Sequence, residues 1–171
     1  MNIGRYEILE EIGQGAMGTV YRARDPLIER TVAIKTVDIG QLRREGADAE
    51  ARFLREAQSA GRLSHPNIVT IYDVGETDNL AYIAMEYLSG PTLRDLLDHS
   101  RMPLDLALDT ARQMAEALAF AHAHGVTHRD VKPSNVVVTG HHGRIKLTDF
   151  GIAHLANSEH TQTGQMLGSP R

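Results

Sequence analysis

A cluster of polar residues stands out in the stretch Val126-Thr127-His128-Arg129-Asp130-Val131-Lys132-Pro133-Ser134-Asn135. Helix-patterned sequence precedes this stretch and the apolar residues 136–138 follow it, which predicts a polar loop held between two regular elements. Loops mounted on a rigid scaffold are where catalytic and binding residues concentrate. In this loop Asp130 is a candidate proton acceptor, Asn135 a candidate metal ligand and Lys132 a charge suited to a phosphate. Considered alone, the stretch fits a solvated polar turn equally well.

Composition narrows the class of protein. The chain has 171 residues, of which 42% are hydrophobic, and a formal net charge of −4. This length and hydrophobic content suit one domain or two small lobes and argue against general disorder. The acidic balance argues against a general nucleic-acid binder, and the lack of cysteine excludes disulfides and thiolate metal sites. No apolar run reaches bilayer length and no secretory signal opens the chain, so a cytoplasmic location is expected, with a later membrane anchor left open.

A glycine pattern follows the first predicted strand, at residues 6–12. Gly13, Gly15 and Gly18 match G-x-G-x-x-G, which nicotinamide-binding proteins share. In those proteins the loop opens into a helix. Here residues 19–24 are β-branched or aromatic at first and then alternate, which predicts a second strand. The glycines then form a flap between antiparallel strands that can cover phosphates, and an ordinary hairpin is the alternative.

A charged residue lies inside the third predicted strand, at 31–37. Lys35 is surrounded there by apolar residues, where an unpaired charge is costly. The next predicted helix, at about 47–63, has an apolar stripe of Ala49, Phe53, Ala57 and Ala60. Glu56 lies on the same inward face, so we predict an ion pair between Lys35 and Glu56. The alternative is a pair between Glu56 and Arg52 along the helix.

Two further strands, at 68–74 and 81–88, are predicted around a hairpin loop at 75–79. The first half of the chain is then a five-stranded antiparallel sheet with one helix. The residues 89–91 contain Gly and Pro and mark a boundary. We therefore expect an α+β fold with one lobe at 1–88 and a second, mainly helical lobe at 89–171.

The second lobe is predicted to begin with a capping box from Thr92 to Asp95 in front of a short helix. A longer helix follows at about 103–124, with a predicted buried stripe of Leu104, Leu108, Ala111, Ala115, Leu118 and His122. Because His122 falls on this stripe, packing is favoured over metal binding. Short strands at 136–138 and 144–147 then place Asp149 at a strand end.

These motifs, taken together, resemble those of the eukaryotic-type (Hanks-type) serine/threonine protein kinases of bacteria. In order they are the glycine loop with Val20, Val32-Ala33-Ile34-Lys35, Glu56, His128-Arg129-Asp130, Asn135 and Asp149-Phe150-Gly151. Each motif is weak alone, and six in the family's order form a strong signal. The resemblance implies a protein-kinase-like two-lobe fold that uses ATP and Mg²⁺ and acts on Ser and Thr hydroxyls of protein substrates.

The resemblance assigns each candidate residue a role. The backbone of Gly13, Gly15 and Gly18 would cover the phosphates, with Lys35 on the α- and β-phosphates and paired with Glu56. Asn135 and Asp149 would bind Mg²⁺, Asp130 would accept or orient the hydroxyl proton, and Lys132 would neutralise the γ-phosphate. The adenine would be held by Ile12, Val20, Ala33, Met85, Val137 and the backbone from Glu86 to Leu88. His128, Phe150, Ile71 and Ala60 would stack as an internal column.

The resemblance also bears on regulation. Arg129 provides a cation that a phosphate can satisfy, and Thr161 and Thr163 are predicted autophosphorylation sites. Ser169 stands where the family usually has threonine.

The family's domain continues beyond Arg171, so we expect a fragment with little activity alone. Its long helix would expose an apolar face that favours self-association. An ATP-binding pseudo-enzyme or interaction module is the alternative function, and a nicotinamide-binding protein is disfavoured by the strand after the glycines.

Overall fold

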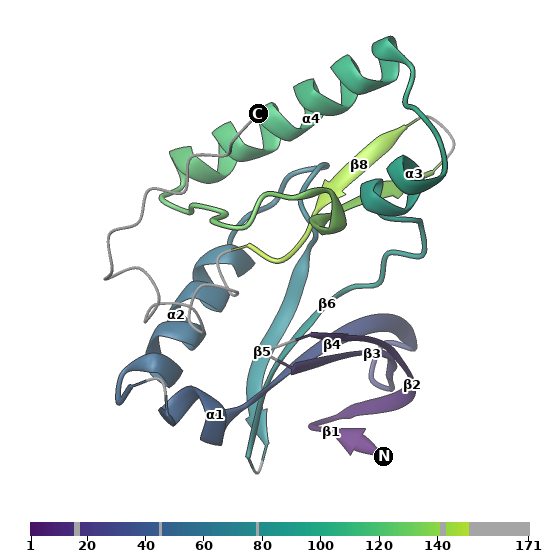
Figure 1. Ribbon diagram of the computed structural model, residues 1–171. Coiled ribbons are helices and arrows are strands. Elements are labelled where there is room, and N and C mark those ends of the chain that lie inside the picture. The colour runs from purple at the N-terminus through teal and green to yellow at the C-terminus, as the bar shows by residue number, and fades with distance from the viewer. Residues whose placement is uncertain (16–17, 45, 78, 141–142, 151–171) are drawn as a thin grey trace.

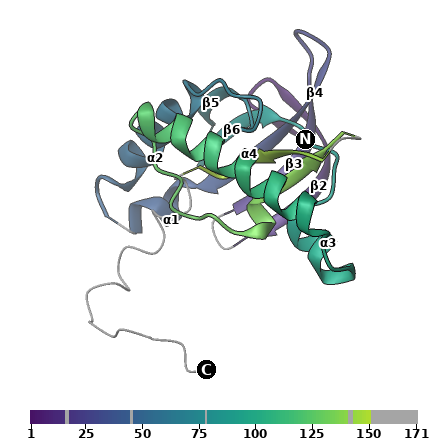
Figure 2. The same ribbon diagram turned by 90° about the horizontal axis from the view of Figure 1, so that it is seen from above.

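The structure, a computed structural model, describes residues 1–15, 18–44, 46–77, 79–140 and 143–150. The first half of the chain forms a curled antiparallel sheet flanked by two helices, and the second half lies above it with one long helix at the far side (Figure 1). Seen from above, α4 crosses the molecule, with α1 and α2 toward one end and α3 near the other (Figure 2). The α+β class and two-part arrangement agree with the prediction.

In the part of the chain that the structure describes, the sheet has six strands, whereas the sequence patterns predict five. They are β1 (Asn2–Ile3), β2 (Tyr6–Gly15), β3 (Gly18–Asp25), β4 (Arg30–Asp38), β5 (Ile71–Thr77) and β6 (Leu80–Glu86), in the order β1-β2-β3-β4-β6-β5. The added strand, β1, pairs antiparallel with β2 through Ile3 and Tyr6, whose side chains are buried. A strand of two residues is too short to show periodicity, so the predicted strand count was wrong.

Among the described residues, two helices accompany the sheet, whereas one is predicted. The short α1 (Ile39–Arg44) buries Ile39 and Leu42, and α2 (Ala49–Gly61) follows it. The predicted inward stripe of α2 is confirmed, since its buried residues are Ala49, Phe53, Ala57 and Ala60. Phe53 is fully buried in the core between α2 and the sheet. This packing places Glu56 toward the junction with the second half.

The second half contains α3 (Leu93–His99), α4 (Leu104–Ala123), the 3-10 turn η1 (Pro133–Asn135) and the hairpin β7 (Val136–Thr139) and β8 (Arg144–Leu147). The predicted capping box is confirmed. The Thr92 hydroxyl accepts the backbone N–H of Asp95 at 3.1 Å, and the Asp95 carboxylate accepts that of Thr92 at 2.8 Å.

The buried face of α4 differs from the predicted stripe. Its buried residues are Thr110, Gln113, Ala117 and Ala121, whereas His122 is exposed. Leu104 and Leu108 are 72% and 62% exposed. The small alanines let α4 approach the β7–β8 core closely, and Gln113 is buried because hydrogen bonds satisfy its amide. The predicted burial of Leu104, Leu108, Ala111, Ala115 and His122 was wrong, and Leu118 is partly buried. The expectation of exposed apolar residues on α4 is confirmed.

A short segment before β5 holds the two halves together by hydrogen bonds. Residues 67–69 run along β8, where the Leu147 N–H donates to the Asn67 carbonyl at 2.8 Å and the Val69 N–H donates to the Leu147 carbonyl at 2.9 Å. The sequence predicts a strand that begins at Ile68, whereas β5 begins at Ile71. The difference arises because the residues before Ile71 pair with β8, in the other sheet. The strand that ends near Asp149 is thereby fixed to both halves.

Candidate active site

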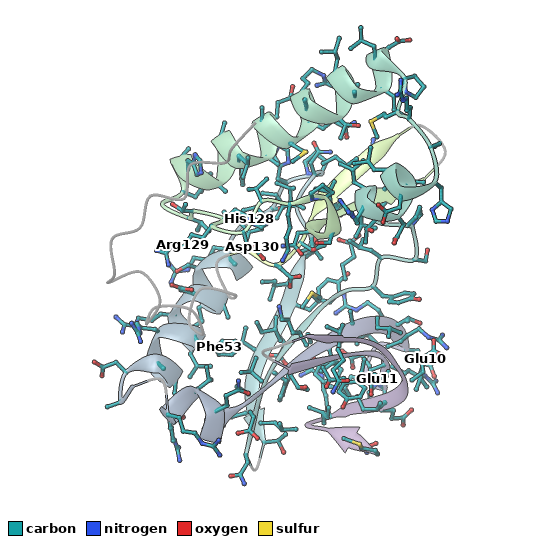
Figure 3. The ribbon with its side chains drawn as sticks, viewed as in Figure 1. Glu10, Glu11, Phe53, His128, Arg129 and Asp130 are labelled. Atoms are coloured by element: carbon teal, nitrogen blue, oxygen red, sulfur yellow. The ribbon has the colours of Figure 1, made fainter. Side chains whose placement is uncertain are left out.

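His128 anchors the polar loop at residues 126–135. The ring is buried, its Nε2 lies 2.7 Å from the Thr148 carbonyl, and its Nδ1 accepts the Asp130 N–H at 3.1 Å. These partners require a neutral imidazole with its proton on Nε2. Burial lowers the pKa of His128, which favours the same neutral form. Figure 3 shows His128, Arg129 and Asp130 between α4 and the end of α2.

The candidate catalytic and metal-binding groups lie in one network. Asn135 Nδ2 donates to the Asp130 carboxylate at 3.0 Å and to its carbonyl at 2.9 Å. Lys132 Nζ lies 3.3 Å from the same carboxylate. The Thr148 N–H donates to the Asn135 carbonyl at 2.9 Å, which sets Asp149 beside this cluster. The loop and the end of β8 thus bring the predicted residues together.

Lys35 reaches this network from the sheet. Its Nζ lies 2.7 Å from Asp149 Oδ1, and the two side chains are 14% and 31% exposed. Asp149 has φ of +59°, a left-handed conformation uncommon outside glycine. Such backbone strain concentrates at functional sites, where surrounding structure maintains it. The sheet and the second half therefore meet at a charged contact.

The predicted ion pair between Lys35 and Glu56 is absent from the described residues. Glu56 Oε1 instead accepts from Arg129 at 2.9 Å, while Glu56 Oε2 is buried without a hydrogen-bond partner among those residues. The alternative partner, Arg52, also makes no pair with Glu56 there. Helix periodicity had placed Glu56 on the correct face, but the competing partners Arg129 and Asp149 come from distant parts of the chain.

The glycine pattern forms a hairpin between β2 and β3, as predicted. Gly13 pairs with Val20 and Gly15 with Gly18, and residues 16–17 lie outside the described ranges. A Cβ added to Gly18 would lie 1.7 Å from the Thr36 carbonyl oxygen. Only glycine fits at this position, because the hairpin packs directly on the backbone of β4.

The predicted adenine-binding side chains come from both halves of the chain. Ala33, Met85 and Val137 are buried, and Val20 and Leu88 pack partly buried against the same core as Ala33 and Met85. Ile12 is 44% exposed on β2. The Glu86 N–H donates to the Thr70 carbonyl at 2.8 Å, so that amide already has a backbone partner.

The internal column is confirmed. The rings of His128 and Phe150 have centroids 4.5 Å apart, and Phe150 shares a buried cluster with Ala60, against which Ile71 packs. Four predicted positions, Gly151, Thr161, Thr163 and Ser169, lie outside the described residues.

Lys146 is a charged residue that the sequence patterns did not single out. It lies on β8 and its Nζ is 2.7 Å from Glu86 Oε2, at the end of β6. The available signal was a lysine between two apolar strand residues, Ile145 and Leu147, which parallels the signal that identified Lys35.

Comparison with known proteins assigns the family. The protein kinase domain model matches residues 6–171. The chain belongs to the protein kinase family. The chain is 46% identical over 169 residues to the serine/threonine-protein kinase PrkC of Bacillus subtilis (strain 168), across 97% of this chain and 26% of that protein. It is 41% identical over 172 residues to the serine/threonine-protein kinase PknB of Mycobacterium leprae (strain TN), across 96% of this chain and 27% of that protein.

A solved kinase domain has the same fold. The crystal structure of the Mycobacterium tuberculosis PknI kinase domain superposes with a TM-score of 0.76 at 36% identity, covering 90% of this chain and 62% of that one. The resemblance to bacterial serine/threonine kinases is confirmed. The chain spans about a quarter of the length of the curated relatives it matches. None of its described helices combines the length and apolar character needed to cross a bilayer.

Proposed function

We propose that this protein is a serine/threonine protein kinase that transfers the γ-phosphate of ATP to Ser and Thr hydroxyls of proteins. The observation that carries the proposal is a single chain of contacts. It runs from Lys132 through Asp130 and Asn135 to the end of β8, and from Asp149 to Lys35. Family membership and the names of the relatives support the same reaction.

The chemistry needs positioning and charge more than a strong base. Phosphoryl transfer passes through a loose transition state whose charge is spread over the phosphate oxygens. Asp130 would orient the substrate hydroxyl and accept its proton, and its hydrogen bond from Asn135 fixes the carboxylate for that task. Lys132, 3.3 Å from that carboxylate, would contact the transferring phosphoryl group.

The donor set also fits a divalent cation. A carboxylate at Asp149 and an amide oxygen at Asn135 are the hard oxygen ligands that Mg²⁺ prefers. Bound there, Mg²⁺ would neutralise charge on the nucleotide phosphates. The backbone of Gly13, Gly15 and Gly18 would cover those phosphates from the β2–β3 hairpin.

The nucleotide base would lie between the two halves. Ala33 and Val20 would contact it from the sheet and Val137 from β7. Ile12, Met85, Glu86 and Leu88 would complete the pocket. On this proposal the lobes are residues 1–88 and 89–171, and the chain acts in the cytoplasm.

The charged pairs of this structure describe a resting arrangement. Lys35 is held by Asp149 and Glu56 by Arg129. For catalysis Lys35 would release Asp149 to the metal and bind the phosphates, with Glu56 as its partner. Glu56 Oε2 is buried and has no hydrogen-bond partner among the described residues, which supports such an exchange, because an unpaired buried carboxylate oxygen is costly.

A transfer assay tests the proposal. The full-length protein is incubated with labelled ATP, Mg²⁺ and a basic protein substrate, and phosphoserine and phosphothreonine are counted. We expect metal-dependent labelling that Asp130→Asn lowers by at least about 100-fold. Metal-dependent ATP binding without transfer by the unaltered chain would favour a pseudo-enzyme. Binding of a nicotinamide dinucleotide in place of ATP would contradict the proposal.

A further inference from the structure

An ion pair outside the phosphate-binding groups links the two halves of the molecule. Lys146 on β8 and Glu86 at the end of β6 are 16% and 26% exposed, with their charged atoms 2.7 Å apart. Most of the other described ion pairs have at least one strongly exposed partner, as in Arg94–Asp98 at 61% and 54%. A pair shielded from water is screened less and holds its geometry more strongly.

Two hydrogen bonds with Thr70 hold Glu86 independently of Lys146. Its backbone N–H donates to the Thr70 carbonyl at 2.8 Å, and its carboxylate accepts the Thr70 N–H at 3.2 Å. The Oε2 atom that takes the Thr70 N–H is also the one that meets Lys146. The carboxylate is thus a junction between β6, the residues before β5, and β8.

Lys146 lies on the same face of its hairpin as Val137. The two residues are directly opposite in the β7–β8 register, and opposite residues of an antiparallel pair point to one face. Ile145 and Leu147, on either side of Lys146, are buried on the other face. Val137 and Lys146 therefore lie on one face of the hairpin, and Lys146 contacts Glu86 from that face.

We propose that Lys146 is a positioning residue of the nucleotide site. Through its ion pair with Glu86, it sets the distance between Val137 on β7 and the backbone of residues 86–88. The inference rests on the proposed ATP-binding function and deepens it. Lys146 needs no contact with the nucleotide, because the ion pair fixes the strand end that does. We therefore expect loss of Lys146 to weaken binding of the base and not of the phosphates.

The test compares binding of ATP and of adenosine, which has no phosphates, to the full chain. Lys146→Met keeps the length of the side chain and removes the charge. We expect the dissociation constants of both ligands to rise by about fivefold, the scale on which residues without ligand contact modulate binding. The turnover number at saturating ATP should stay within about twofold of the unaltered protein, since the transferring groups are untouched.

Three companion variants separate positioning from general damage. Lys146→Arg retains the cation and should bind both ligands nearly as well as the unaltered protein. Glu86→Gln should weaken both ligands as Lys146→Met does, and the double variant should be no weaker than either single one. Arg94→Met removes an exposed ion pair on α3 and should leave both affinities unchanged.

The outcomes distinguish this inference from the proposed function. Unchanged affinities in Lys146→Met, a loss confined to ATP, or a faster turnover would overturn the positioning role while leaving the kinase proposal intact. If Lys146→Met does not fold, the comparison of Lys146→Arg with Glu86→Gln replaces it. Equal adenosine affinity in those two variants would overturn the positioning role. If the unaltered chain binds neither ligand, the proposed function itself fails.

Discussion

Two sides of the candidate site are built from different interactions. The proposed base side, around Ala33, Met85 and Val137, consists of buried apolar side chains from three strands. The proposed phosphate side, around Lys35 and Asp149, consists of partly exposed charges joined in pairs. Apolar packing has few solutions because shapes must interlock, whereas charges can exchange partners at a small free-energy difference.

That contrast has a functional meaning. A site that binds a nucleotide needs a base pocket of fixed shape, and a site that switches needs contacts with two arrangements of similar free energy. On the proposed function, the base side has the fixed shape. The phosphate side has contacts with two arrangements, since both Lys35 and Glu56 have an alternative partner of opposite charge within the same network.

The largest expected effect concerns Lys35. Lys35→Met should lower kcat/KM by about 100- to 1,000-fold, the usual loss when one preorganised charged group is removed. The free energy of unfolding of Lys35→Met should change little, because Asp149 is 31% exposed and can be solvated when Lys35 is replaced. Steady-state kinetics and denaturant titration check the two parts. A large loss of stability would show that the charged side also carries the fold.

The apolar column should respond in the opposite way. Phe150 is 3% exposed and packs on His128, so Phe150→Ala should lower the free energy of unfolding by about 3 kcal/mol. Denaturant titration measures the change, with Leu108→Ala on the exposed face of α4 as the matched control, expected to be near neutral. Equal effects in the two variants would erase the distinction between packed and exposed apolar residues.

A smaller effect is expected from the exchanged pair. Arg129→Gln removes the partner that holds Glu56, so a larger fraction of molecules should form the pair between Lys35 and Glu56. Basal transfer activity should rise by about two- to fivefold, the scale of a partly exposed ion pair. The double variant with Glu56→Gln should show no rise. Reduced activity in Arg129→Gln alone would mean that the described pairing is not inhibitory.

The smallest effect is a pH dependence of stability. Burial holds the pKa of His128 below its ordinary value of 6.5. The unfolded chain therefore takes up the proton first as the pH falls, so stability should decrease as the pH is lowered below about 6.5. Protonation of Nδ1 would also break the hydrogen bond from Asp130 N–H.

Denaturant titrations between pH 7.5 and 5.5 measure this decrease. His128→Gln should flatten the slope, while His122→Gln, at an exposed position on α4, should retain it. The same slope in both variants would assign the pH dependence to other groups.

Local sequence determined much of this protein. The order of the longer strands and helices, the buried face of α2, the capping box at Thr92 and the hairpin after Gly13 all follow from periodicity and residue type over a few neighbours. The motif order also identified the candidate site, since each residue type suits one part of phosphoryl transfer.

Other features depended on the packing of distant segments. Neither the short β1 nor the buried face of α4 could be predicted, because β1 has no periodicity and α4 has apolar residues on more than one face. The partners of the charged residues were decided only by the tertiary structure. Lys35 meets a carboxylate 114 residues away and Arg129 meets one 73 residues away. Sequence gives the face on which a charge lies, but its partner is whichever opposite charge the folded chain brings nearest.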